Sequence, residues 1–224
     1  MMAVAPLGYD TNYSYMTTIS GLLDKRPALE WLLGIDRNTG QYIPELAESW
    51  EMAPNGQDWT IKLRKEVQFH DGFGEFTAKD VKHSLFLLVQ PISQASGISA
   101  WREVTGVEEG DTEAIVTQKV EEMVEIVDDY TVIIHARQVQ PEFEFFMSHQ
   151  RNMPMESKAR WDAVGGHEGY GQKIVGTGPF KFAERIEGVH VLHEAVEDHW
   201  RVTPDFKEFE FRWVPEPATA WPLC

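Results

Sequence analysis

Residues 46–88 constrain the fold most, because their pattern predicts two strands, two turns and a helix in a fixed order. Residues 59–64 alternate apolar and polar side chains, which is typical of a strand with one buried and one solvent-facing side. The preceding Asn55-Gly56 supplies the positive φ angles of a tight turn, so an earlier strand completes a hairpin. Thr77, with Asp80 three residues later, is a capping-box variant that begins a helix. We therefore expect a hairpin that leads into a helix.

Further hairpins follow along the chain. Residues 120–127 and 131–136 predict one hairpin, and residues 179–185 and 189–194 predict another. Residues 208–213 alternate aromatic and charged side chains and predict one more half-buried strand. There is no internal repeat. The pattern indicates a mixed α/β or α+β protein with many hairpins.

The predicted helices are short, and the predicted loops are rich in glycine, serine and acidic residues. Helices are expected at 16–23, at 156–164 and after Pro141, the last with Phe143, Phe146 and Met147 on one face. Surface loops are expected at 91–113, around Trp101, and at 165–169. His83 is expected on a solvated helix face.

Composition excludes several classes of protein. With 42% apolar and 12% aromatic residues among 224, the chain is long and apolar enough for one or two folded domains. Its 20 basic and 36 acidic side chains give a net charge of -16, the opposite of what a nucleic-acid binder needs. Cys224 is the one cysteine, so no intrachain disulfide is expected. No apolar run approaches the roughly 20 residues of a membrane span, and the first residues do not form a signal peptide.

No set of residues predicts catalysis. His190 and His193 should point to opposite sides of a strand, so no convergent metal site is expected, and no cofactor is expected either. His70, in a turn beside Asp71, is interpreted as a loop-stabilising residue rather than a general base. The serines lack a nucleophile elbow. Residues 176–180 lack the lysine of a phosphate loop, so we interpret them as a tight turn into a strand.

Two other classes stay open at this point. A carbohydrate-active enzyme needs two carboxylates that face each other across a cleft, and the sequence cannot show such a pair. The 8 Trp could stack on sugars, although their scatter along the chain favours core packing. A stand-alone interaction module needs a complete core within 224 residues.

Several separated segments nevertheless resemble one family, the family 5 extracellular solute-binding proteins. The segments are Leu46-Ala47-Glu48-Ser49-Trp50-Glu51, Leu63-Arg64-Lys65, Val67-Gln68-Phe69-His70-Asp71-Gly72, Phe76-Thr77-Ala78-Lys79-Asp80-Val81, Val175-Gly176-Thr177-Gly178-Pro179-Phe180 and Glu197-Asp198-His199-Trp200. Their order and spacing agree with the family from near residue 1 to residue 219. Glu66 departs from the pattern, because a glycine is usual there.

The resemblance implies a truncated form of a bilobed, class II type, periplasmic-binding-protein-like fold. Residues 1–45 and 173–224 would form a discontinuous, incomplete first lobe, and residues 46–172 an inserted second domain. The opposite ligand-binding lobe would be absent.

The implied function is that of the substrate-binding component of an ABC importer, which is not an enzyme. It would bind an oligopeptide, dipeptide or other small solute between two lobes and deliver it to membrane permease subunits. The intact protein would be a periplasmic or cell-surface monomer, although this chain shows no export signal.

The resemblance also suggests site residues. The loop after the first strand would face the cleft, and its polar residues are the predicted solute contacts: Tyr9, Asp10, Thr11, Asn12, Tyr13 and Ser14. The predicted structural motif residues are Glu48, Trp50, His70, Asp71, Gly72, Gly176, Thr177, Gly178 and Pro179.

The end of the chain suggests a shifted reading frame. Residues 220–224 can be encoded by codons that, in another frame, read Leu-Ala-Ala-Leu, which continues the family pattern. We expect the downstream coding DNA to continue that pattern, and we expect this chain alone not to bind a solute tightly.

Overall fold

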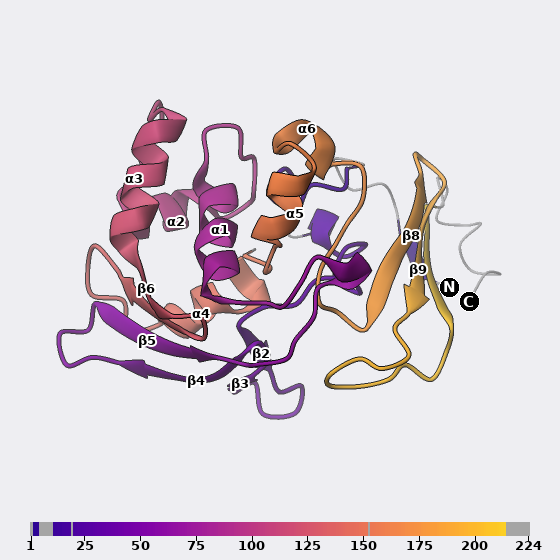
Figure 1. The fold of residues 1–224 in the computed structure, drawn as a ribbon, viewed down its shortest axis with the longest axis horizontal. Coiled ribbons are helices and arrows are strands. Elements are labelled where there is room, and N and C mark those ends of the chain that lie inside the picture. The colour runs from indigo at the N-terminus through magenta and orange to yellow at the C-terminus, as the bar shows by residue number, and fades with distance from the viewer. Residues whose placement is uncertain (1, 5–10, 19, 152, 214–224) are drawn as a thin grey trace.

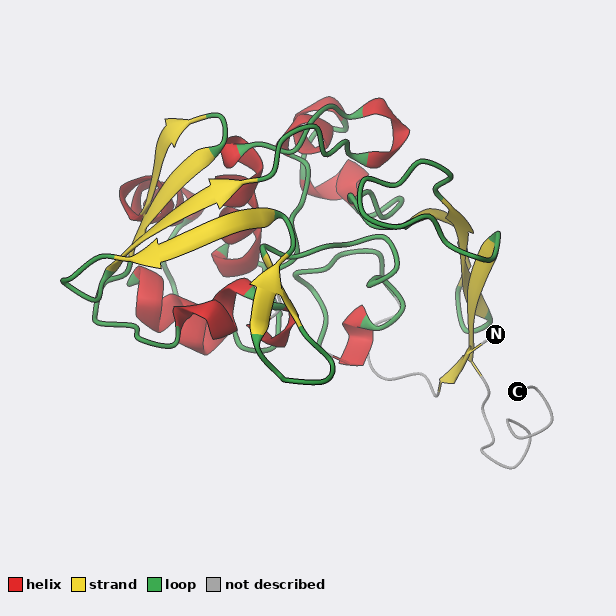
Figure 2. Ribbon diagram, turned by 90° about the horizontal axis from the view of Figure 1, so that it is seen from below, coloured by secondary structure: helices red, strands yellow, loops and turns green. Residues whose placement is uncertain are grey.

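The computed structural model describes residues 2–4, 11–18, 20–151 and 153–213. Its described part is built around two four-stranded sheets, one at each end of the long axis (Figure 1). Seen from below, the first sheet lies on one side with helices behind it, and the second lies on the other side (Figure 2). No helix of the described ranges combines the length and apolar character needed to cross a membrane.

The first sheet is antiparallel and has the strand order β4-β5-β7-β6. Its strands are β4 (Ala47–Met52), β5 (Asp58–Leu63), β6 (Val124–Asp128) and β7 (Thr131–His135). The helices α1 (Ala78–Val89), α2 (Ile98–Thr105), α3 (Glu113–Met123) and α4 (Phe143–Met147) belong to the same half of the molecule. The largest hydrophobic core joins the inner side chains of this sheet to those of these helices.

The second sheet has the order β1-β10-β9-β8, and its strands come from both ends of the chain. They are β1 (Met2–Val4), β8 (Phe180–Ile186), β9 (His190–Ala195) and β10 (Glu208–Trp213). β1 is parallel to β10, whereas the other pairs are antiparallel. A smaller core packs Leu22, Ala28, Leu29, Trp31 and Ile174 against this sheet.

Short elements connect the two sheets. They are the pair β2 (Leu33–Ile35) and β3 (Tyr42–Pro44), the helices α5 (Lys158–Ala163) and α6 (His167–Tyr170), and the 3-10 turns η1 (Ser20–Leu22), η2 (His70–Gly72) and η3 (His149–Arg151).

The predicted hairpin and helix at 46–88 are confirmed. β4 and β5 pair with Trp50 opposite Ile61, and Gly56 has a φ of 69° in the turn. The Thr77 amide donates to Asp80 Oδ2 over 2.8 Å, and the reciprocal half of the capping box is also present. Glu66, where the family pattern has glycine, adopts a φ of 65°, a backbone conformation that favours glycine.

Other predicted elements are also confirmed. Phe143, Phe146 and Met147 are buried on one side of α4, α5 falls within 156–164, and β8, β9 and β10 fall where the alternating patterns place them.

Two of the predicted loops each contain a short helix that was not expected. Residues 91–113 contain α2, whose Trp101 is fully buried against the rings of Phe143 and Phe146. Residues 165–169 contain the start of α6, and its Tyr170 is buried. In each segment, glycines flank a short turn that tertiary packing holds in the helical conformation.

The expected strand at 120–127 begins only at Val124, because residues up to Met123 complete α3. Thr112 caps this helix, and Val116, Val120 and Met123 are buried at helical spacing. The helix predicted at 16–23 is reduced to η1. Residue 19 lies outside the described part, and the carbonyls of Tyr15 and Thr17 accept hydrogen bonds from Gln94 and Ser96 instead of from a following helical turn.

Candidate functional site

The predicted solute-contact loop is described from residue 11 onward, and Tyr9 and Asp10 lie outside the described residues. Residues 11–17 run between two distant parts of the chain. On one side, the Gln94 amide donates to the Tyr15 carbonyl over 2.9 Å, and Ser93 Oγ donates to the same oxygen over 3.0 Å. On the other side, the loop contacts residues 156–172. Hydrogen bonds on both sides therefore hold the loop in place.

Ser14 points inward, not into solvent. Its hydroxyl donates to Glu156 Oε1, and Tyr170 Oη donates to Glu156 Oε2 over 2.8 Å. All three side chains are buried. Burial raises the pKa of Glu156, while the two hydroxyl donors, Arg160 and Lys25 oppose that rise. The Ser14 hydroxyl is consequently committed to a contact within the protein.

Tyr13 forms an aromatic stack beside this buried contact. Its ring lies parallel to that of His167, with 4.5 Å between centroids and an interplanar angle of 11°. Its hydroxyl donates to the His167 carbonyl over 2.8 Å, and Tyr15 Oη lies 2.9 Å from His167 Nδ1. Gly171 permits the close approach, since a Cβ there would lie 2.3 Å from the Tyr13 ring. Tyr13 and His167 are both half-buried, so part of the stack is accessible to solvent.

Asn12 ties the loop to the second sheet, and Thr11 shapes its start. Asn12 Nδ2 donates to the carbonyl of Gly171 over 3.0 Å, and its Oδ1 accepts from Arg185 Nε over 2.7 Å. The Arg185 guanidinium also forms an ion pair with Asp24 at 2.6 Å. Thr11 Oγ1 accepts the Tyr13 amide over 3.2 Å.

The predicted motif residues at 70–72 and at 176–179 meet where the chain passes between the two sheets, whereas Glu48 and Trp50 lie in β4. The His70 amide donates to the Gly176 carbonyl over 2.9 Å, and its Nε2–H donates to the Gly178 carbonyl over 2.8 Å. Burial lowers the pKa of His70, which favours a neutral ring. The interpretation of His70 as a loop-stabilising residue agrees with these contacts.

The neighbouring motif residues also make backbone or surface contacts. Asp71 and Gly72 have positive φ angles, and Asp71 pairs with Lys173 at 2.5 Å. The Pro179 carbonyl accepts the Val196 amide over 2.9 Å. Glu48 is exposed and lies 3.9 Å from Arg64. Trp50 Nε1 donates to Glu144 over 3.3 Å.

Glycine is required at two of the motif positions. A Cβ on Gly176 would lie 2.0 Å from the Ala28 carbonyl oxygen, and one on Gly178 would lie 2.5 Å from the Pro27 carbonyl oxygen. The Gly178 amide donates to that Ala28 carbonyl over 3.0 Å, so two backbone segments lie in direct contact here.

An ionic group around the buried Glu30 lies at the same place, and of its residues only Thr177 is among the predicted site residues. We call it the crossing cluster: Glu30, Glu45, Thr177, His199, Trp200 and Arg201. Glu30 Oε2 accepts from Thr177 Oγ1 and Trp200 Nε1, each over 2.9 Å, and Oε1 accepts from Arg201 over 2.8 Å. Arg201 also pairs with Glu45 at 3.2 Å. The Glu197-Asp198-His199-Trp200 motif indicated one part of this cluster, but Glu30 carried no sequence signal.

Proton positions within the crossing cluster follow from its contacts. His199 Nδ1 accepts the amides of Arg201 and Val202, so its proton lies on Nε2, which donates to the Thr177 carbonyl over 2.9 Å. Burial raises the pKa of Glu45 to about 7; Arg201 lowers it, and the nearby Glu30 adds to the rise. Arg201 thus pairs with both carboxylates of the cluster.

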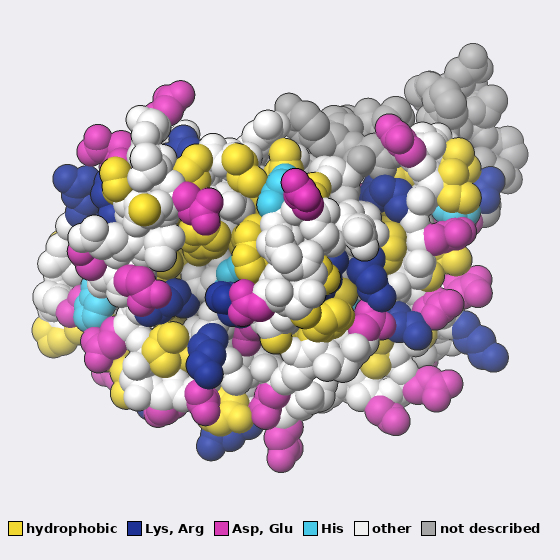
Figure 3. Space-filling model, turned by 45° about the horizontal axis from the view of Figure 1, so that its top comes forward, with side chains coloured by type: hydrophobic (Ala, Val, Ile, Leu, Met, Phe, Trp, Pro, Cys, Tyr) yellow, Lys and Arg dark blue, Asp and Glu magenta, His cyan; other side chains and the backbone are white. Residues whose placement is uncertain are grey.

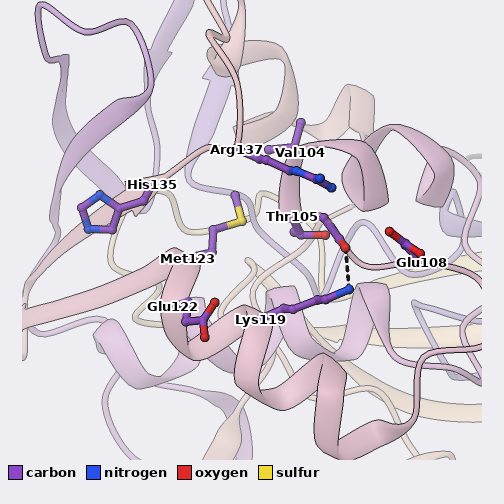
Figure 4. A pocket seen from close by; sticks show the side chains of 9 residues that line it. Val104, Thr105, Glu108, Lys119, Glu122, Met123, His135 and Arg137 are labelled. Atoms are coloured by element: carbon purple, nitrogen blue, oxygen red, sulfur yellow. Dashed lines mark hydrogen bonds between the residues drawn. The ribbon is translucent and has the colours of Figure 1, made fainter.

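One pocket among the described residues, of about 370 Å³, is lined by Lys119, His135, Arg137 and neighbouring residues of α2 and α3 (Figure 4). Lys119 Nζ donates to the Gly106 carbonyl over 2.7 Å and pairs with Asp111, so it does not point freely into the pocket. No group of three or more potential metal ligands lies together within the described ranges. On the face shown in Figure 3, acidic and basic side chains are interspersed, without a basic patch.

Comparisons with known proteins agree with this picture. A profile of the bacterial extracellular solute-binding proteins, family 5 middle region, matches residues 41–222. The chain is 27% identical over 208 residues to di/tripeptide-binding protein 2 of Pseudomonas aeruginosa, covering 89% of this chain and 38% of that protein. It is 29% identical over 170 residues to the periplasmic oligopeptide-binding protein OppA of Haemophilus influenzae, covering 75% of this chain and 30% of that protein.

The fold agrees as well. The structure of peptide-bound OppA from Listeria monocytogenes superimposes with a TM-score of 0.80 at 18% identity, covering 99% of this chain and 43% of that one. The chain thus spans less than half the length of the relatives that it matches. Because the profile covers most of its residues, the chain belongs to the family 5 bacterial extracellular solute-binding proteins.

Proposed function

We propose that this chain supplies one side of the solute cleft of an ABC-importer binding protein, which binds a peptide or a similar small solute without transforming it. The observation that carries the proposal is the loop at 11–17, which is held along both edges and presents the half-exposed Tyr13–His167 stack. The relatives named above are a di/tripeptide-binding and an oligopeptide-binding protein, which favours a peptide as solute.

The proposed division into lobes follows the path of the chain. All strands of the first sheet come from residues 47–135, whereas the second sheet combines residues 2–4 with residues 180–213. This path supports an inserted domain at 46–172 and a first lobe made from 1–45 and 173–224. The opposite lobe would belong to the part of the relatives that this chain does not span. Closure of two lobes about a hinge would then enclose the solute.

The contacts of the buried carboxylates favour binding over catalysis. Glu30 accepts hydrogen bonds from three side chains, and Glu156 from two, so neither carboxylate faces an open cleft. We propose membrane permease subunits as partners and a periplasmic or cell-surface location, in keeping with an extracellular family.

The test uses trialanine as a probe and isothermal calorimetry as the measurement. The 224-residue chain alone should show no binding at micromolar concentration, because it forms one side of the cleft only. A chimaera that continues this chain with the remaining portion of Haemophilus influenzae OppA should bind trialanine. A chimaera that melts cooperatively yet binds neither trialanine nor any member of a tripeptide library would contradict the proposal. Micromolar binding by the 224-residue chain alone would contradict the one-sided cleft.

A further inference from the structure

Glu156 lies beneath the loop and joins parts of the chain that are far apart in sequence. Its carboxylate accepts from Ser14, 142 residues away, and from Tyr170, 14 residues away. Both oxygens are therefore occupied by hydroxyl donors, one from the loop and one from the end of α6. A buried carboxylate with both oxygens occupied fixes the relative position of its donors, since breaking either bond leaves a buried polar atom without a partner.

The backbone around Glu156 is itself anchored to α1. The Glu156 amide donates to Ser84 Oγ over 2.8 Å, and the Lys158 amide donates to Asp80 Oδ1 over 2.9 Å. Ser84 and Asp80 are both buried in α1. The position of the Glu156 carboxylate is consequently set by a twelve-residue helix of the main core, not by the loop that it holds.

Tyr170, the second hydroxyl donor to Glu156, is also held in place by several contacts. Arg160 is buried and donates to the carbonyls of Tyr170 and Lys173, each over 2.7 Å, with its guanidinium 4.2 Å from the centre of the Tyr170 ring. Tyr170 therefore presents its hydroxyl to Glu156 from a fixed position. His167, which stacks on Tyr13, lies in the same short helix as Tyr170.

We infer that Glu156 is a positioning residue for solute binding. Because α1 fixes its position, Glu156 fixes the position of the loop at 11–17, and with it the geometry of the Tyr13–His167 stack. This inference rests on the proposed function, because it takes the loop to be a solute-contact surface. It also implies that Asn12 and Ser14 act by holding the loop in place, whereas Tyr13 provides the surface that a solute meets.

The first experiment needs no solute. Amide hydrogen exchange of the 224-residue chain is measured over α1 and at Gln94 and Ser96 in wild type, Glu156→Leu and Glu156→Gln. The amides of Gln94 and Ser96 donate to the loop carbonyls of Tyr15 and Thr17, so we call their exchange the loop exchange. Leucine removes both acceptors, so the loop exchange should rise roughly tenfold or more while α1 is unchanged. Glutamine should restore slow exchange, because hydroxyl groups can accept as well as donate. Glu109→Leu, at an exposed glutamate, is the matched control.

The second experiment measures trialanine affinity in the chimaera. Glu156→Leu should weaken binding roughly tenfold, and Glu156→Gln should stay within about threefold of wild type. If Glu156→Leu does not fold, Ser14→Ala removes only one of the two bonds and should show a smaller increase in loop exchange. Unchanged loop exchange in a folded Glu156→Leu or Ser14→Ala variant, or failure of glutamine to restore it, would overturn the inference. Loss of trialanine binding by the wild-type chimaera would instead contradict the proposed function.

Discussion

His83 lies on the side of α1 that faces α5 and α6, surrounded by aromatic rings. Its ring centroid is 5.3 Å from that of Trp161 and 6.3 Å from that of Phe86, and the side chain is 4% exposed. The expectation of a solvated His83 is wrong, because α5 and α6 cover a position that α1 alone would leave open. Among the described residues, Nε2 of this ring has no hydrogen-bond partner.

Replacing His83 with phenylalanine should stabilise the protein, and more so in acid. Burial, aided by Lys158, lowers the pKa of His83 from 6.5 to about 3. Because folding lowers this pKa, the contribution of His83 to the free energy of unfolding is complete above pH 6.5 and is lost as the pH falls towards 3. His83→Phe removes this loss, so its advantage over wild type should grow by about 2 kcal/mol between pH 7.5 and pH 5 in urea denaturation.

His135 serves as a control, because its pKa is shifted in the opposite direction to that of His83. Partial burial lowers its pKa, but the bonds to Asp58 and Glu125 outweigh this, and the net shift is upward. His135 therefore contributes stability at low pH that is lost as the pH rises. His135→Gln should be least stable relative to wild type in acid. If both variants shift with pH in the same direction, the electrostatic explanation fails.

Among the contacts between elements, the close backbone contact at Gly176 should tolerate an added side chain least. Gly176→Ala places a methyl group 2.0 Å from the Ala28 carbonyl oxygen, so the chain segments must separate. Gly188→Ala meets open space but keeps a φ of 68°. We expect a loss of more than about 3 kcal/mol for Gly176→Ala and about 1 kcal/mol for Gly188→Ala, measured by thermal or urea denaturation. Equal losses would show that steric contact is not the cause.

The elements also show what the sequence could and could not predict. The β4–β5 hairpin and the start of α1 depend on local signals, an Asn-Gly turn and a capping box, and both are confirmed. α2 lacks such signals, since glycines flank it and its one fully buried tryptophan packs against α4, some 40 residues later. The resemblance to the family predicts a loop at residues 9–14, but the contacts of Ser14 with Glu156 and of Tyr13 with His167 join residues too distant in sequence for any local pattern.

At the scale of the molecule, the crossing cluster ties the two sheets together. Its residues come from segments just before β2, just before β4, just before β8 and just after β9. Glu30 is 1% exposed and accepts hydrogen bonds from Thr177, Trp200 and Arg201, so one buried carboxylate joins the segments that flank the two sheets.

Ionisation within the crossing cluster should be visible in the stability of the whole protein. The pKa of Glu45 is raised to about 7, chiefly by burial, so its protonated form favours the folded state. The corresponding stability is complete below pH 4.5 and is lost as the pH rises to about 7. The free energy of unfolding of Glu45→Gln, relative to that of wild type, should rise by on the order of 2 kcal/mol between pH 4.5 and pH 7.5. Glu51→Gln, at an exposed position, should show no such trend.

The parallel pairing of β1 with β10 has a consequence for synthesis of the chain. Met2 lies opposite Phe211, so the partners are 209 residues apart (211 − 2). The first sheet is complete once residue 135 has emerged, and it can form while the rest is still being made. At roughly 5–20 residues per second, β1 remains without its neighbour for about 10–40 s. Within these residues, β1 is thus the earliest strand to be made and among the last to gain its hydrogen-bonded neighbour.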